Sequence, residues 1–88
     1  MNVRFESSFE KDLGKIKDRK LLIKIKDTVL EVRQASRPTD VTSLLKLQGY
    51  QTYYRIRLGD YRIGIEIIND EVIFARVLHR KDIYRYFP

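Results

Sequence analysis

Basic side chains alternate with apolar ones in the second half of the chain, at a spacing that suits phosphate chemistry. Arg55 and Arg57 are separated by one residue, and Arg62 follows beyond a Gly-Asp pair. A strand period of two points all three away from the apolar side. If the Gly-Asp pair makes a tight turn, Arg57 and Arg62 lie opposite each other and repel. A bound anion relieves that repulsion, and the guanidinium fork matches phosphate. The alternative is a solvated outer face with Glu66 as a counter-charge.

The single histidine, His79, comes directly before Arg80 and Lys81. No spaced set of carboxylates accompanies it, so the sequence predicts no metal site. An imidazole titrates near neutral pH and is suited to general acid–base chemistry. The alternative is a histidine at the end of a strand, in a surface loop.

The C-terminal segment mixes rings with cations: Tyr84, Tyr86 and Phe87 alternate with Arg80, Lys81 and Arg85. This mixture fits RNA, whose bases stack on rings and whose phosphates contact cations. The alternative is a segment whose rings close an edge of the core. We expect that packing role for Phe87, whereas Tyr84 and Tyr86 remain open between packing and facing the arginines.

Composition narrows the function classes. The chain has 88 residues and a formal net charge of +6, which indicates a polyanionic partner. It has no Cys, which excludes disulfides, thiolate zinc sites and a Cys nucleophile. No apolar run reaches the roughly 18 residues of a membrane span, and the N-terminus does not resemble a signal peptide. P-loop, dinucleotide-binding and serine-hydrolase motifs are absent. We therefore expect a cytoplasmic protein with no membrane contact, no small-molecule cofactor and no metal.

The first half of the chain has mainly helical patterns. Residues 2–6 alternate and predict a short strand, and Ser7 with Glu10 forms a potential capping box. Apolar residues then recur at helical spacing in two stretches, the second opening at Asp18 or Arg19. The sequence therefore predicts a helical hairpin up to the break at Arg37–Asp40.

The second half has mainly strand patterns. Residues 38–52 are expected to form a connector, and alternation begins at Tyr53. Gly59-Asp60 and Asn69-Asp70 predict tight turns, and residues 72–78 predict a central strand. The tail from His79 is expected to pack on the sheet as a short strand or helical turn. The predicted fold is α+β in one domain, residues 1–88: an N-terminal strand and a helical hairpin on a small antiparallel sheet of about four strands.

The order of elements and three motifs resemble the RelE/ParE toxin superfamily over essentially the whole chain. The motifs are Leu47-Gln-Gly, Tyr54-Arg-Ile-Arg-Leu-Gly-Asp-Tyr-Arg-Ile and Val77-Leu-His-Arg-Lys-Asp-Ile-Tyr-Arg. RelE-type members cut mRNA in the ribosomal A site without a metal. ParE-type members share the fold and poison DNA gyrase. Both kinds are neutralised by an antitoxin.

The resemblance implies roles for the basic and aromatic residues. It places Arg55, Arg57, Arg62 and Arg80 where members of the superfamily carry basic residues, and Tyr84 or Tyr86 near a functional tyrosine. Together with the residue chemistry above, the catalytic candidates are Arg57, Arg62, His79, Arg80, Tyr84 and Tyr86. The RNA-binding candidates are Arg55, Lys81 and Arg85. Some relatives carry lysines where this chain has Arg55 and Arg57. An arginine does not release its proton in proteins, which leaves charge stabilisation to those positions.

The favoured hypothesis is a type II toxin that cleaves mRNA on the ribosome and binds a cognate antitoxin. The alternatives are a gyrase poison on the same scaffold and a non-catalytic basic binding module. The arginines, His79 and the terminal tyrosines favour RNA. The resemblance does not decide between Tyr84 and Tyr86.

Overall fold

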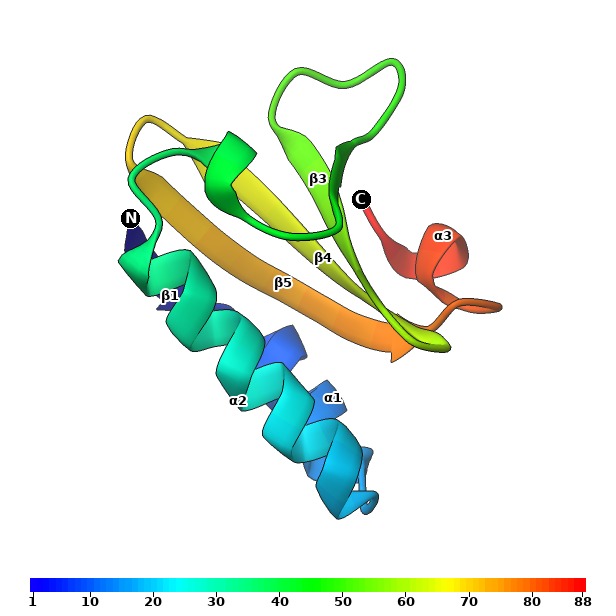
Figure 1. The fold of residues 1–88 in the computed structure, drawn as a ribbon. Helices are drawn as coiled ribbons and strands as arrows, with labels where there is room; N and C mark the ends of the chain where they lie inside the picture. The colour runs from blue at the N-terminus through cyan, green and yellow to red at the C-terminus, as the bar shows by residue number, and fades with distance from the viewer.

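The protein folds into a five-stranded mixed sheet with helices on both faces (Figure 1). The structure is a computed structural model that describes residues 1–88. The elements are β1 (Asn2–Phe5), α1 (Ser7–Lys15), α2 (Arg19–Gln34), the 3-10 turn η1 (Pro38–Asp40), β2 (Leu44–Lys46), β3 (Tyr53–Leu58), β4 (Tyr61–Ile68), β5 (Glu71–His79) and α3 (Ile83–Tyr86).

The strand order is β1-β5-β4-β3-β2, with β1 parallel to β5 and every other pair antiparallel. The α+β class is confirmed, but the antiparallel sheet of about four strands is wrong in two respects. The expected connector contains β2, whose three residues are too few to display alternation. The direction of β1 is set by pairing with a strand almost 70 residues later, which local periodicity does not reveal.

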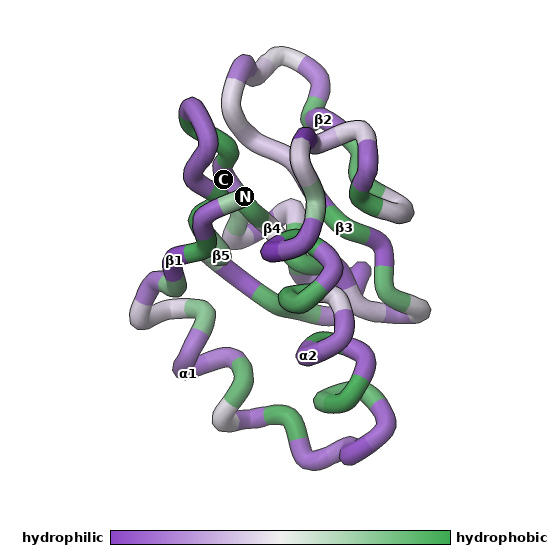
Figure 2. The backbone as a smooth tube through the Cα atoms, turned by 60° about the vertical axis from the view of Figure 1, so that its left-hand side comes forward, coloured by the Kyte–Doolittle hydropathy of each residue, from purple (hydrophilic) through white to green (hydrophobic).

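Helices α1 and α2 cover one face of the sheet and enclose the main core. Phe9, Ile25 and Val32 pack there with Ile63 and Val77 from the sheet. In Figure 2 both helices alternate between hydrophilic and hydrophobic residues, as expected for helices half-exposed to water. None of the helices combines the length and apolar character needed to cross a membrane.

The two helix starts differ in how well sequence predicts them. Helix α2 begins at Arg19, one of the two expected starts, and Asp18 caps it. Its Oδ1 accepts from the backbone N–H groups of Lys20 (3.0 Å) and Leu21 (3.3 Å). The capping box at Ser7 is wrong, because α1 already begins at Ser7 and has no side-chain cap.

Side chains of α1 complete the part of β5 that β1 leaves unpaired. β1 pairs with β5 only as far as Phe74. Beyond it, Ser8 Oγ donates to the carbonyl of Ala75 at 2.6 Å, and Asp12 Oδ2 accepts from the backbone N–H of Val77 at 3.0 Å. The helix thus satisfies a strand edge that is otherwise short of partners.

Asp12 also forms a two-pronged ion pair with Arg76. Arg76 Nε lies 2.8 Å from Oδ2 and Nη2 lies 3.1 Å from Oδ1. Asp12 is only 4% exposed, so the pair is largely shielded from water. The hydrogen bond to Asp12 raises the pKa of the Arg76 guanidinium above its ordinary value. Every acceptor oxygen of Asp12 therefore has a partner, which is what a buried carboxylate requires.

Helix α3 packs on the opposite face of the sheet. Leu47, Ile83 and Phe87 form a second apolar cluster there, so the predicted helical turn and the packing role of Phe87 are confirmed. Phe87 lies directly over Gly64, where a Cβ would come within 2.6 Å of the ring. Only glycine permits this approach, so Gly64 determines where the C-terminal segment docks.

We predict that Asp12→Ala lowers the free energy of unfolding by about 3 kcal/mol or more, because it leaves the charge of Arg76 and the N–H of Val77 without a partner. Asp27→Ala, at an exposed position of α2, changes it by less than about 0.5 kcal/mol. Urea denaturation measures both. Equal losses would contradict the structural role of Asp12.

We predict that Gly64→Ala lowers the free energy of unfolding by about 1–3 kcal/mol through overpacking against Phe87. In a Phe87→Ala background its cost is smaller by about 0.5–3 kcal/mol. Gly14→Ala has free space around it in α1 and stabilises by about 0.5–1 kcal/mol. The same cost for Gly64→Ala with and without the Phe87 ring would show that the two do not interact.

Candidate functional site

The β3–β4 hairpin brings together the arginines of the candidate site. Gly59, with φ +59°, makes the turn, and Arg57 is paired directly with Arg62 across the ladder. Arg55 is paired with Gly64 on the same face, which is the face that α3 partly covers. The predicted juxtaposition of Arg57 and Arg62 is therefore confirmed.

Arg62 is the centre of this group. Its Nη1 donates to the carbonyls of Gly59 (2.7 Å) and Tyr61 (2.8 Å), which hold the guanidinium at the turn. Burial lowers the pKa of the Arg62 guanidinium from its ordinary value. The positive charges of three neighbours, Arg55, Arg57 and Arg80, lower it further. We call these four residues the arginine cluster. Because all four guanidinium groups stay charged, they repel one another, and a bound anion would reduce this repulsion.

The arginine cluster is poorly neutralised within the chain. None of the ion pairs in the structure involves Arg55, Arg57 or Arg62. Arg55 Nη1 makes one long contact with the carbonyl of Ser43, at 3.5 Å, and its Nε is buried without a partner. Glu66, a possible counter-charge from sequence, accepts from Thr52 Oγ1 instead. Unpaired donors and unbalanced charge are the properties of an anion site.

Asp60 joins the end of β5 to the hairpin. The backbone N–H of Arg80 donates to the Asp60 carbonyl at 2.7 Å, and Arg80 Nε lies 4.0 Å from Asp60 Oδ1. Sequence analysis assigned Asp60 only to a turn. The contacts of Asp60 with Arg80 depend on the strand order, so no local sequence pattern indicates them.

The structure separates the two tyrosines that sequence left open. Tyr84 is 59% exposed and contributes to the electrostatic surroundings of Arg62, where it opposes the lowering of the pKa. Tyr86 lies elsewhere, with its ring centroid 5.6 Å from Cζ of Arg76. Tyr84 is thus the tyrosine that the fold associates with the arginine cluster.

His79 lies on the other face of the sheet. It is paired with Tyr61 in the ladder, with ring centroids 5.6 Å apart. Tyr61 and Arg62 are consecutive in β4 and point to opposite faces. Nδ1 of His79 accepts from the backbone N–H of Lys81 at 3.1 Å, a contact within the turn before α3. The structure therefore does not bring His79 into the arginine cluster. Lys81 and Arg85 are both exposed.

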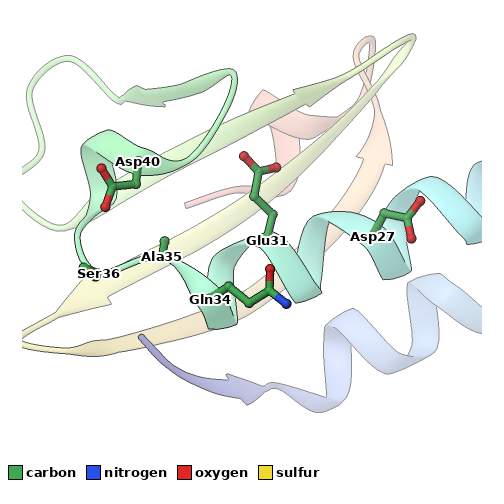
Figure 3. Close-up of a pocket in the computed structure, with 6 residues that line it drawn as sticks. All are labelled: Asp27, Glu31, Gln34, Ala35, Ser36 and Asp40. Atoms are coloured by element: carbon green, nitrogen blue, oxygen red, sulfur yellow. The ribbon is translucent and has the colours of Figure 1, made fainter.

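A different hollow, of about 370 Å³, lies at the C-terminal end of α2 (Figure 3). Asp27 and Glu31 of α2 and Asp40 of η1 line it, and Glu31 Oε2 accepts from the backbone N–H of Thr42 at 2.7 Å. Three carboxylates repel a polyanion, so this hollow is not suited to nucleic acid. No group of three or more metal-binding side chains is arranged to hold a metal ion.

Comparison with known proteins places this geometry in context. A family model described as the ParE toxin of type II toxin–antitoxin systems, parDE, matches residues 3–84. The curated protein Toxin RelE3 of Methanocaldococcus jannaschii is 46% identical over an alignment of 93 positions that spans both chains completely.

Solved structures share the fold. The toxin-antitoxin complex RelB-RelE from Methanococcus jannaschii contains a chain that is 42% identical, with a TM-score of 0.79 and coverage of 97% of this chain and 99% of that one. The archaeal RelE-RelB complex from Pyrococcus horikoshii is 19% identical, with a TM-score of 0.74 and coverage of 93% and 97%.

We predict that Arg57→Gln raises the free energy of unfolding at low ionic strength by about 0.2–1 kcal/mol, because it removes the charge opposite Arg62. The gain shrinks in about 1 M salt, where the screening length falls to about 3 Å. Lys17→Gln removes the same charge from the α1–α2 loop and is the control. If both variants respond equally, the repulsion is not local to the cluster.

Proposed function

The chain belongs to the ParE toxin family within the RelE/ParE superfamily, and from this premise we propose that it is a ribosome-dependent mRNA endoribonuclease. As a member it is a type II toxin. The observation that carries the finer proposal is the arginine cluster, in which Arg57 and Arg62 are paired across the ladder and Tyr84 contributes to the electrostatic surroundings of Arg62. Clustered guanidinium groups, of which only Arg80 has an acidic partner, are suited to a phosphate that gains charge during reaction.

In the proposed reaction, the 2′-oxygen of one nucleotide attacks the phosphorus that links this nucleotide to the next one. The 2′-oxygen bonds to phosphorus and loses its proton, while the bond to the 5′-oxygen breaks and that oxygen takes up a proton. The products are a 2′,3′-cyclic phosphate and a 5′-hydroxyl. We assign Arg57, Arg62 and Arg80 to the negatively charged phosphorane, and Arg55 to the neighbouring RNA backbone.

Proton transfer needs a group other than the arginines, which do not release protons. Tyr84 contributes to the electrostatic surroundings of Arg62 and carries a hydroxyl that can give or take a proton, so we assign it one of the two transfers. His79 faces the other side of the sheet, and we give it a positioning role through its hydrogen bond to Lys81.

The site lacks a second proton-transfer group, which favours help from the ribosome. We propose that the ribosome orients the mRNA so that the 2′-oxygen lies in line with the leaving oxygen. This target implies a cytoplasmic location. We also propose a cognate antitoxin as partner, because two of the similar toxins were solved in complex with one.

A second candidate is a gyrase poison, which the match to the ParE family model favours. A gyrase poison would not cleave RNA, so the arginine cluster would have no role in RNA chemistry. Gyrase-dependent DNA cleavage in the presence of the chain, with intact mRNA, would select this alternative.

We predict that Arg62→Ala reduces the rate of mRNA cleavage on translating ribosomes by about 100-fold or more, and Tyr84→Phe by about 100-fold. Primer extension on a reporter mRNA measures the rates, and circular dichroism verifies the fold. Tyr50→Phe removes a hydroxyl from the loop between β2 and β3, where the ring packs against Tyr53, and leaves the rate unchanged. A fully active, folded Arg62→Ala protein would contradict the assignment, and a loss confined to Tyr86→Phe would exchange the tyrosines.

A further inference from the structure

A second hollow lies on the same face of the sheet as the arginine cluster, on the other side of Phe87. It measures about 260 Å³, and its lining includes Glu6, Tyr53, Glu66, Arg76, Tyr86 and Phe87. Its residues come from the start of the chain, three strands and the C-terminal segment. The proposed function does not use it.

The strand register fixes its relation to the arginines. Arg62, Gly64 and Glu66 alternate along β4 and share one face, and Phe87 covers Gly64 between the other two. Four residues of strand correspond to about 13 Å. An RNA strand whose phosphate lies at Arg62 can therefore place a nearby base in the hollow.

The walls of the hollow suit a flat ring. Tyr53 packs against Phe87 with the two ring planes at 86°, and Tyr86 is held next to the Arg76 guanidinium. Tyrosine rings are the usual surfaces on which single-stranded bases stack. Arg76 is already neutralised by Asp12, so the hollow offers no free cation to a phosphate.

The polar groups of the hollow suit a base that donates hydrogen bonds. Glu66 Oε2 accepts from Thr52 Oγ1 at 2.8 Å, which orients the carboxylate and leaves Oε1 available. Glu6 adds a second carboxylate at the rim. Carboxylates only accept hydrogen bonds. Guanine, adenine and cytosine present amino groups to them, whereas uracil presents one N–H between two carbonyl oxygens that a carboxylate repels.

We propose that this hollow reads a base of the mRNA near the cut, with Glu66 selecting a base that carries an exocyclic amino group and rejecting uracil. The inference rests on the proposed cleavage of mRNA and deepens it, because it assigns sequence preference to a place distinct from the reacting phosphate.

The test compares wild type, Glu66→Gln and Glu10→Gln on translating ribosomes, with a reporter mRNA randomised around the cut. Wild type disfavours uracil at one position by about tenfold or more, as expected for a good hydrogen-bonded base contact. Glu66→Gln both donates and accepts, so it brings the ratio to about twofold or less. Glu10→Gln removes the same charge from an exposed site on α1 and keeps the wild-type ratio.

The outcomes separate this inference from the proposed function. Cleavage by all three proteins with the same base preference, or with none, overturns the role of Glu66 and leaves the nuclease intact. Absence of cleavage by wild type removes the nuclease proposal.

Binding tests the hollow without cleavage, by following backbone amide resonances during titration with 5′-GMP and 5′-UMP. The two nucleotides share a phosphate, which perturbs Arg57 and Arg62 equally. Only GMP perturbs Thr52 and Glu66, and Glu66→Gln reduces that difference. Equal or absent responses at Thr52 and Glu66 overturn the proposal.

Discussion

The close approach of Phe87 to Gly64 determines how the face with the candidate site is organised. A side chain at position 64 would meet the ring at 2.6 Å, so the absence of a Cβ is what lets the C-terminal segment lie flat on the sheet. Ile83 and Phe87 anchor α3 on this face, and Tyr84 between them contributes to the electrostatic surroundings of Arg62. The same ring separates the arginine cluster from the hollow around Glu66. One packing contact therefore sets the spacing of charge, hydroxyl and aromatic groups.

The buried Asp12–Arg76 ion pair holds α1 against β5, the strand next to β4 in the sheet. It fastens α1 to the part of β5 that β1 does not reach, and Arg76 in turn lies next to the ring of Tyr86. Helix, sheet and C-terminal segment are thus connected through one buried carboxylate. The arginines of the β3–β4 hairpin are different, because they lack such partners and repel one another. The Asp12–Arg76 pair therefore stabilises the fold, whereas the proposed activity is assigned to the unpaired arginines of the hairpin.

Local patterns predicted the hairpin and its paired arginines because a two-residue turn fixes the register of neighbouring strands. The start of α2 beside Asp18 was predictable because a helix cap depends on nearby sequence. The burial of Phe87 was predictable from its apolar ring, but its contact with Gly64 was not. The parallel direction of β1, the contact of Asp60 with Arg80 and the face occupied by His79 depend on long-range pairing. One further signal was visible in the sequence: Asp12 interrupts the apolar side of α1, and Arg76 interrupts an apolar strand, as expected for partners in a buried pair.

The most direct test of the proposed function is to identify the ends of a reporter mRNA after incubation with the wild-type protein, with and without translating ribosomes. The account predicts cuts only when ribosomes are present, with a 2′,3′-cyclic phosphate on one fragment and a 5′-hydroxyl on the other. Intact mRNA in both samples, from a protein shown to be folded, would contradict it.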